Sequence, residues 1–135
     1  MGLCQSDLVQ ATEKGVLEQT YDFQKAKVVR VIDGDTFVIV AKHNKRLTRF
    51  YFRLYGCDCP EKNTEEGKAV KVFVKQALEN KVVDIQVLTN KIHNGKKIRE
   101  KFGRLIGFIY LNKENFTDRL VKNGMAKLYF GGRKE

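Results

Sequence analysis

The sequence feature that most constrains the fold is a pair of β-branched runs that meet at an Asp-Gly dipeptide. The runs "AKVVRVI" (26–32) and "TFVIV" (36–40) have the composition of strands, and Asp-Gly between apolar runs is a strong hairpin signal. The same turn places two acids, Asp33 and Asp35, on either side of Gly34 in a chain whose formal net charge is +10. Because like charges so close together repel, the pair indicates either turn chemistry or a cation site.

The rest of the chain carries three further strand patterns and one clear helical pattern. Strands are predicted over "TRFYFRLY" (48–55), "VVDIQVL" (82–88) and "RLIGFIYL" (104–111). The segment "GCDCPEKN" (56–63), which holds the only proline, is expected to be a loop. Over 64–79 apolar residues recur at helical spacing and predict an amphipathic helix; they are Val70, Phe73, Val74, Ala77 and Leu78.

Both ends of this helix have sequence signals. Asn63 followed by Glu66 matches a capping box at the start, and Asn80 suits the end. Gly67 falls in the first turn, where it is expected to weaken the helix.

A second, shorter helix is predicted over "DRLVKN" (118–123), with Thr117 as its N-cap and Gly124 just past its end. The order is therefore three strands, a helix, two strands and a helix. This order matches a mainly β, α+β fold: a five-stranded OB-type Greek-key barrel with two packed helices. We assign residues 1–24 to an N-terminal arm without sustained periodicity and residues 25–135 to a single domain.

Composition indicates a basic protein of a reducing compartment. Lys and Arg number 26 against 16 Asp and Glu, an excess that favours a polyanionic partner, either nucleic acid or anionic lipid. Three sparse cysteines, Cys4, Cys57 and Cys59, predict a reduced setting rather than a disulfide framework. The C-x-C pair with isolated His43 and His93 lacks zinc-ligand spacing. With no secretory signal and no membrane-spanning run, we expect an intracellular, cytoplasmic monomer.

Charged residues near the predicted strand ends have the chemistry of phosphodiester hydrolysis. They are Asp33, Asp35, Arg53, Asp58, Glu61 and Arg104. Such hydrolysis needs a positioned water, a group that orients or deprotonates it, and cations that stabilise charge on the phosphate oxygens. Calcium takes hard oxygen ligands such as carboxylates and carbonyls, and arginine forks onto phosphate oxygens. Scattered acids and arginines occur on most surfaces, so turn chemistry and surface ion pairs remain alternatives.

Three motifs, "VIDGDT" (31–36), "FRLYGCDCPE" (52–61) and "EKFGR" (100–104), together resemble the staphylococcal (micrococcal) nuclease, or thermonuclease, family. They occur in the family's order and spacing, and the similarity covers roughly residues 26–130. The resemblance implies calcium-dependent hydrolysis of single- and double-stranded DNA and of RNA, with cleavage of the 5′ P–O bond to leave 3′-phosphates. The rival is a non-catalytic nucleic-acid-binding or protein-binding module, like the degenerate nuclease-like repeats of Tudor-containing proteins. Those repeats typically lose the charged set that this chain retains.

The resemblance also implies how the charged set divides between metal and phosphate. Asp35, Asp58 and the backbone carbonyl of Cys59 would be calcium ligands, although the family usually has Thr where this chain has Cys59. Asp33 would have a supporting or structural role, with direct coordination as the alternative. A thiol in place of the hydroxyl weakens any side-chain hydrogen bond at that position but leaves the carbonyl unchanged.

The catalytic roles implied by the resemblance fall on three residues. Glu61 would orient or activate the attacking water, whereas Arg53 and Arg104 would clamp the phosphate and stabilise its charge. Lys101 would be a further substrate contact, and Tyr129 would offer its ring to a base.

Several details depart from the family's pattern. Phe102 replaces a common Tyr beside Lys101, and Phe130 is the alternative to Tyr129 as the aromatic contact. The sequence given ends at "GGRKE" (131–135), so the family's usual C-terminal helix is expected to be absent.

The first six residues, "MGLCQS", fit the M-G-x-x-x-[ST] pattern of N-myristoylation. Gly2 would carry myristate and Cys4 palmitate, and two acyl chains anchor a protein stably where one does not. Residues 7–24 would then tether the domain to the cytoplasmic face of a membrane. A chance match to this short pattern is the alternative, and a lipid-anchored basic adaptor without hydrolysis is a third function class.

Overall fold

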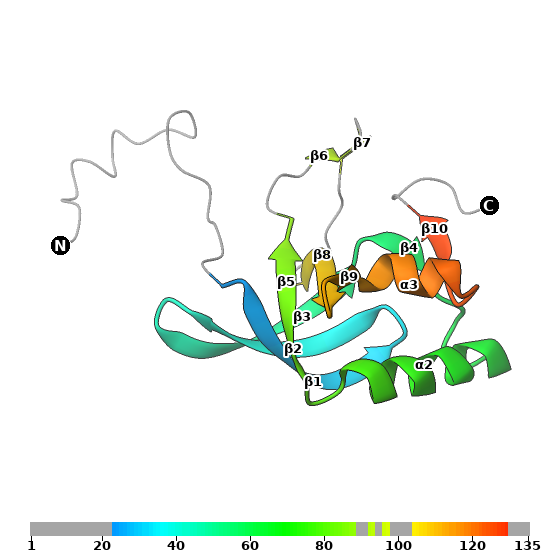
Figure 1. The fold of residues 1–135 in the computed structure, drawn as a ribbon, viewed down its shortest axis with the longest axis horizontal. Coiled ribbons are helices and arrows are strands. Elements are labelled where there is room, and N and C mark those ends of the chain that lie inside the picture. Colours follow the sequence, from blue (N-terminus) through cyan, green and yellow to red (C-terminus); the bar gives the residue numbers. More distant parts are fainter. Residues whose placement is uncertain (1–22, 89–91, 94–95, 98–103, 130–135) are drawn as a thin grey trace.

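The computed structural model describes residues 23–88, 92–93, 96–97 and 104–129. Its main sheet has the order β3-β2-β1-β5-β8-β9, and β3 also pairs with β8, which closes five strands into a barrel (Figure 1). All these pairings are antiparallel except that of β3 with β8. The strands are β1 (Lys25–Asp33), β2 (Thr36–His43), β3 (Arg46–Leu54), β5 (Val82–Val87), β8 (Arg104–Leu111) and β9 (Glu114–Asn115). The predicted OB-type barrel and its five strands are confirmed.

Side-chain alternation along each strand explains how the barrel forms. In β3, Phe52 and Leu54 are fully buried in the core, whereas Arg49 and Tyr51, which have the opposite side-chain direction, are exposed on the outer face. The period of two is the signature of a strand with one face buried. The core extends to Phe23, which is 8% exposed and packs against the ring of Phe50.

Helix α2 (Glu65–Leu78) packs on β1 and covers one side of the barrel (Figure 1). Its buried face is the predicted apolar stripe. The predicted cap at Asn63 is wrong: Thr64 is the N-cap, because its hydroxyl accepts a hydrogen bond from the backbone N–H of Gly67 at 3.0 Å. The predicted end is confirmed, since Asn80 follows the C-cap with φ of 66°.

Helix α3 (Phe116–Lys122) lies against β8 and β9. The predicted cap at Thr117 is also wrong, because the Asn115 side chain accepts hydrogen bonds from the N–H groups of Thr117 and Asp118. Thr117 is buried instead and donates its hydroxyl to the carbonyl of Tyr55 at 3.2 Å. Gly124 follows the helix with φ of 71°, as predicted.

The segment predicted as a loop over 56–63 begins as a strand. β4 (Gly56–Asp58) pairs with β10 (Lys127–Tyr129), so Lys127 lies opposite Asp58. Local patterns could not reveal this pairing because the partner strand lies about 70 residues further along the chain. A second small pair joins β6 (Ile92–His93) to β7 (Lys96–Lys97).

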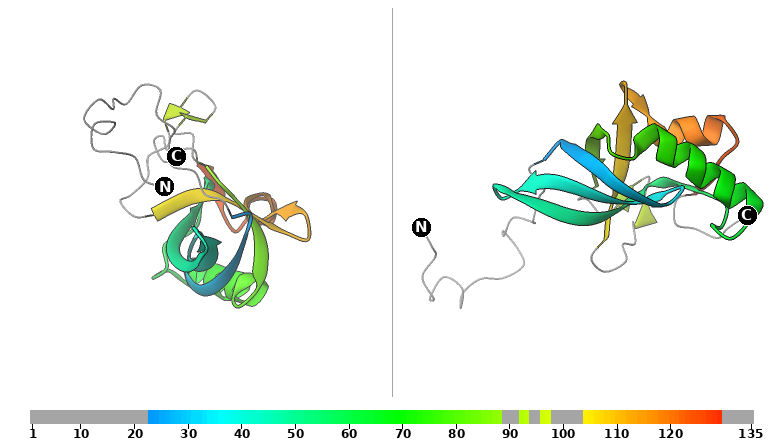
Figure 2. Two further views of the ribbon diagram at one scale, coloured as in Figure 1. Left: turned by 90° about the vertical axis from the view of Figure 1, so that its left-hand side faces the viewer. Right: turned by 90° about the horizontal axis from the view of Figure 1, so that it is seen from below.

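The hairpin of β2 and β3 extends beyond the barrel, away from α2 and α3 (Figure 2). Its paired residues run from Thr36 opposite Arg53 at the barrel end to His43 opposite Arg46 at the tip. In the part of the chain that the structure describes, no helix has the length and apolarity needed to cross a bilayer.

Candidate active site

The turn between β1 and β2 positions Asp35. Asp33 is still within β1 and pairs with Thr36, so the two turn residues are Gly34 and Asp35, one position later than the predicted Asp33-Gly34 turn. Gly34 is required here for space, because a Cβ at this position would lie 2.9 Å from the sulfur of Cys59. The turn therefore packs directly against the segment that carries Asp58.

The carboxylate of Asp35 is nearly buried and held by three donors. The Thr36 hydroxyl donates to Oδ1 at 3.0 Å, and the backbone N–H of Cys59 donates to Oδ2 at 3.2 Å. The Arg53 guanidinium lies 3.4 Å from Oδ2. Only 6% of Asp35 is exposed. These charge-assisted contacts therefore replace the hydrogen bonds that water would otherwise donate to its carboxylate.

Arg53 lies between two carboxylates. It projects from β3 opposite Thr36, and its Nη2 is 3.4 Å from Asp35 Oδ2 and 3.5 Å from Asp58 Oδ1. The same nitrogen lies 3.5 Å from the carbonyl of Cys57. These distances are long for hydrogen bonds but within the range of ion pairs. The two acids therefore face one shared cationic group.

Arg104 supplies a second guanidinium from the adjacent strand. It lies opposite Tyr51 in the parallel β3–β8 pairing, which puts it on the same outer face as Arg53. Burial and then the charge of Arg53 lower the pKa of Arg104, and the charge of Asp35 partly offsets this. Its Nε is buried, and no acceptor among the described residues bonds it. An anion placed between the two guanidinium groups would supply that acceptor.

Glu61 is exposed in the segment between β4 and α2, three residues after Asp58. The structure fixes its backbone, since its carbonyl accepts hydrogen bonds from Thr64 Oγ1 at 2.7 Å and from Thr64 N at 3.0 Å. A Cβ on Gly67 would overlap that same carbonyl group. Thr64 and Gly67 are thus positioning residues that sequence reasoning missed, although a glycine in the first turn of an otherwise good helix was a usable signal.

Two further candidates, Asp33 and Cys59, lie close to Asp35 along the chain or in space. Burial first, and then the charge of Asp35, raise the pKa of Asp33, which is half-buried. A hydrogen bond with Cys57, followed by burial, raises the pKa of the Cys59 thiol far above its ordinary value.

Of the remaining predicted site residues, Tyr129 is the one that falls within the described part of the chain. Tyr129 is half-buried in β10 opposite Gly56, next to the strand that carries Asp58. The predictions that concern Gly2, Cys4, Lys101, Phe102, Phe130 and the C-terminal segment 131–135 all fall outside the described residues.

The donor set suits a hard cation such as calcium. Asp35 and Asp58 each have a carboxylate oxygen close to the same Arg53 nitrogen, and Cys59, with its backbone carbonyl, directly follows Asp58 in the chain. Within the described residues there is no cluster of three or more His, Cys, Asp or Glu side chains able to hold a metal ion. A calcium ion here would therefore take carbonyl and water oxygens for the rest of its six to eight ligands.

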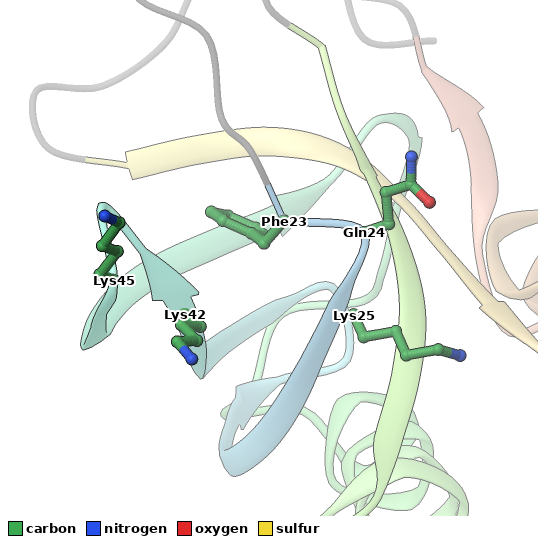
Figure 3. Close-up of a pocket in the computed structure, with 5 residues that line it drawn as sticks. All are labelled: Phe23, Gln24, Lys25, Lys42 and Lys45. Carbon is green, nitrogen blue, oxygen red and sulfur yellow. The ribbon is translucent and has the colours of Figure 1, made fainter.

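A separate basic pocket of about 500 Å³ lies at the other end of the β2–β3 hairpin (Figure 3). Its described lining residues are Phe23, Gln24, Lys25, Lys42 and Lys45. Lys42 is six residues along β2 from Thr36, a separation of roughly 20 Å in a strand. This pocket is not part of the acidic site.

Comparison with known proteins finds a family model and several relatives that match this chain. The family model for staphylococcal nuclease homologues matches residues 51–135. A thermonuclease of Staphylococcus hyicus is 36% identical over 119 residues, which cover 84% of this chain and 61% of the relative. A thermonuclease of Staphylococcus intermedius is 34% identical over 109 residues, which cover 76% of this chain and 58% of the relative.

A more distant relative is an uncharacterized endonuclease of Haemophilus influenzae, 29% identical over 103 residues, which cover 76% of this chain and 51% of the relative. The chain thus spans about half to three fifths of the length of these relatives. The family model matches more than half of the chain, and the two thermonucleases are similar over most of it: the chain belongs to the family of staphylococcal nuclease homologues.

Proposed function

We propose that this protein is a nuclease that hydrolyses phosphodiester bonds of DNA and RNA in a calcium-dependent reaction. The observation that carries the proposal is the pair of guanidinium groups, Arg53 and Arg104, on one outer face beside the carboxylates of Asp35 and Asp58. Two such cations form a site for a phosphate anion, and the carboxylates beside them suit a hard metal. Matches to thermonucleases support the same reaction class.

In the proposed reaction, Arg53 and Arg104 donate hydrogen bonds to the non-bridging oxygens of the scissile phosphate. Both groups stabilise the charge that develops there as a water attacks phosphorus. Glu61 orients this water and accepts its proton. The bond between phosphorus and the 5′ oxygen breaks, that oxygen takes a proton, and the products are a 3′-phosphate and a 5′-hydroxyl.

Asp35, Asp58 and the Cys59 carbonyl would hold the calcium ion. When bound, the ion supplies positive charge next to the phosphate oxygens. Arg53 would then share the two carboxylates with the metal. Some N–H groups of its guanidinium would thus be available to donate to the phosphate. The hydrogen bonds that the Thr36 hydroxyl and the Cys59 N–H donate to Asp35 would keep its carboxylate in place when calcium binds.

The first test is cleavage of single-stranded DNA, double-stranded DNA and RNA with added calcium and with EDTA. Glu61→Gln keeps the size of the side chain but removes the carboxylate, and Glu66→Gln, at an exposed acid in the first turn of α2, is its matched control. We expect calcium-dependent cleavage that Glu61→Gln reduces strongly and Glu66→Gln leaves intact. Product ends that lose phosphate to a phosphatase acting on 3′ termini would support the proposed bond cleavage.

The alternative is a non-catalytic module that binds nucleic acid or protein. It predicts salt-sensitive DNA binding without cleavage in any metal. That result with pure, folded protein would refute the nuclease proposal.

A further inference from the structure

We propose that the outer face of β3 is a binding track for single-stranded nucleic acid, along which Tyr51 stacks on a base beside the scissile phosphate and Arg49 contacts a further phosphate. This inference rests on the proposed function, because it extends the phosphate site of Arg53 and Arg104. It assigns substrate contacts to Tyr51 and Arg49, which are not among the site residues predicted from the sequence.

The register of the strands places Tyr51 at the edge of the phosphate site. Tyr51 is two residues from Arg53 in β3, so both side chains lie on the same face. The parallel pairing puts Tyr51 directly opposite Arg104 in β8. A nucleotide next to a phosphate held by these two arginines therefore lies over the Tyr51 ring.

The exposure of Tyr51 is not explained by packing. The residue is 45% exposed and belongs to neither apolar cluster of the described chain. Its strand neighbours Phe50 and Phe52 account for the core contacts of this segment. A large, exposed aromatic ring next to a phosphate site has the properties of a stacking platform, and stacking tolerates any base because each base has a π-face.

Arg49 continues the track toward the hairpin tip. Arg49 is two residues from Tyr51 and four from Arg53 in β3, so all three side chains lie on the same face, and Arg49 is exposed. Among the described residues no acid forms an ion pair with its guanidinium, whereas Arg53 has two. The distance from residue 53 to residue 49 is about 13 Å in an extended strand. The outer face of β3 therefore carries the Arg49 guanidinium, the Tyr51 ring and the Arg53 guanidinium in this order. No acidic residue lies in β3.

Single-stranded nucleic acid fits this face better than a duplex does. A single strand exposes base faces and phosphates in alternation, and both are needed to use a ring that lies between two guanidinium groups. In a duplex the bases are stacked on one another, so Tyr51 would have no base face to contact. The prediction is therefore a selective loss on single strands when the ring is removed.

The test measures binding separately from catalysis. In the Glu61→Gln background with calcium present, fluorescence anisotropy gives Kd for a labelled single-stranded oligonucleotide and for the matching duplex. Tyr51→Ala and Tyr51→Thr remove the ring, and Thr retains the β propensity of the position. Tyr51→Phe keeps the ring. Arg46→Ala, which removes an exposed arginine at the hairpin tip from the other side of the strand, is the control for Arg49→Ala.

We expect ring removal to weaken single-strand binding roughly 5- to 100-fold, with Tyr51→Phe close to the parent and duplex binding little changed. Arg49→Ala is expected to reduce the salt slope, d log K/d log[salt], by about 0.7, as for one phosphate contact on a single strand, whereas Arg46→Ala leaves the slope unchanged. The proposed binding track would be refuted if these variants remain folded, as checked by thermal melting, and still bind single strands as tightly as the parent. Equal losses on duplex and single strand would also refute it.

The outcomes separate this inference from the proposed function. If the otherwise unmodified chain does not cleave but Tyr51 and Arg49 govern single-strand binding, the nuclease proposal fails and the track remains. If the chain cleaves in calcium but Tyr51→Ala changes neither Kd nor KM on single strands, the track fails and the nuclease proposal remains.

Discussion

The most informative single substitution is Gly67→Ala in the first turn of α2. Helix propensity alone predicts that this change stabilises the helix by about 1 kcal/mol. In the structure, however, a Cβ on Gly67 would overlap the carbonyl oxygen and carbon of Glu61 and lie 3.1 Å from Cα of Lys62. The neighbours are backbone atoms, so the segment that carries Glu61 has to move away from the helix.

The two effects can be compared in magnitude. Overpacking of this kind costs about 1–3 kcal/mol, which offsets the propensity gain and leaves a net destabilisation of about 0–2 kcal/mol. The effect on activity is larger, because a displacement of about 1 Å of a catalytic group costs on the order of 10²-fold in rate. Activity, rather than stability, is thus the sensitive measurement.

The assay is kcat/KM on single-stranded DNA together with thermal unfolding, for Gly67→Ala, Glu61→Gln and the double variant. If Gly67 acts through Glu61, the double variant is no less active than Glu61→Gln alone, because the two losses are not independent. Val72→Ala, at an exposed position of the same helix, controls for propensity. A Gly67→Ala protein with full activity and a raised Tm would refute the positioning role.

Further predictions concern the other parts of the molecule. Removing either guanidinium, by Arg53→Ala or Arg104→Ala, is expected to lower kcat by on the order of 10²–10³, measured with saturating DNA and calcium; a change below threefold in both would contradict their role. Cys59→Thr is expected to leave kcat/KM within about twofold, since only the backbone carbonyl is assigned to the metal; a large loss would show that the thiol takes part. Burial raises the pKa of Tyr55, so the unfolded state loses this proton first as the pH rises. The stability contributed by neutral Tyr55 is therefore fully present below the ordinary tyrosine pKa of about 10 and falls above it; urea unfolding should show a smaller alkaline loss for Tyr55→Phe, and equal losses would contradict the assignment. We also propose acylation at the N-terminus, so Gly2→Ala in a eukaryotic host should move the protein from the membrane to the soluble fraction; unchanged partitioning would refute it.

The parts of the fold that follow local patterns could be predicted from the sequence. Strands β1, β2, β3, β5 and β8 each show a period of two or a β-branched run, and α2 shows a clean helical period. Their order was sufficient to identify the barrel. The charged residues could be named because they fall at the ends of these elements.

The parts that depend on distant contacts could not be predicted. β4 exists because Gly56–Asp58 meets Lys127–Tyr129, and neither stretch shows a strong local pattern. By residue type Asn63 is a somewhat better cap than Thr64, so only the geometry of the structure selects Thr64. The need for Gly67 arises from its contact with Glu61, which no periodicity reports.

The acids in this basic chain have an electrostatic explanation. Arg53 and Arg104 lie on adjacent strands, and the charge of Arg53 lowers the pKa of Arg104. Asp35 acts in the opposite direction on Arg104 and also pairs with Arg53, so it offsets the repulsion that would otherwise separate the two guanidinium groups. Asp35 and Asp58 each form an ion pair with Arg53, and the buried Nε of Arg104 is left without an acceptor among the described residues. The acids thus hold the cations together without neutralising both, which leaves the capacity for one further anion at the position where a phosphate would bind.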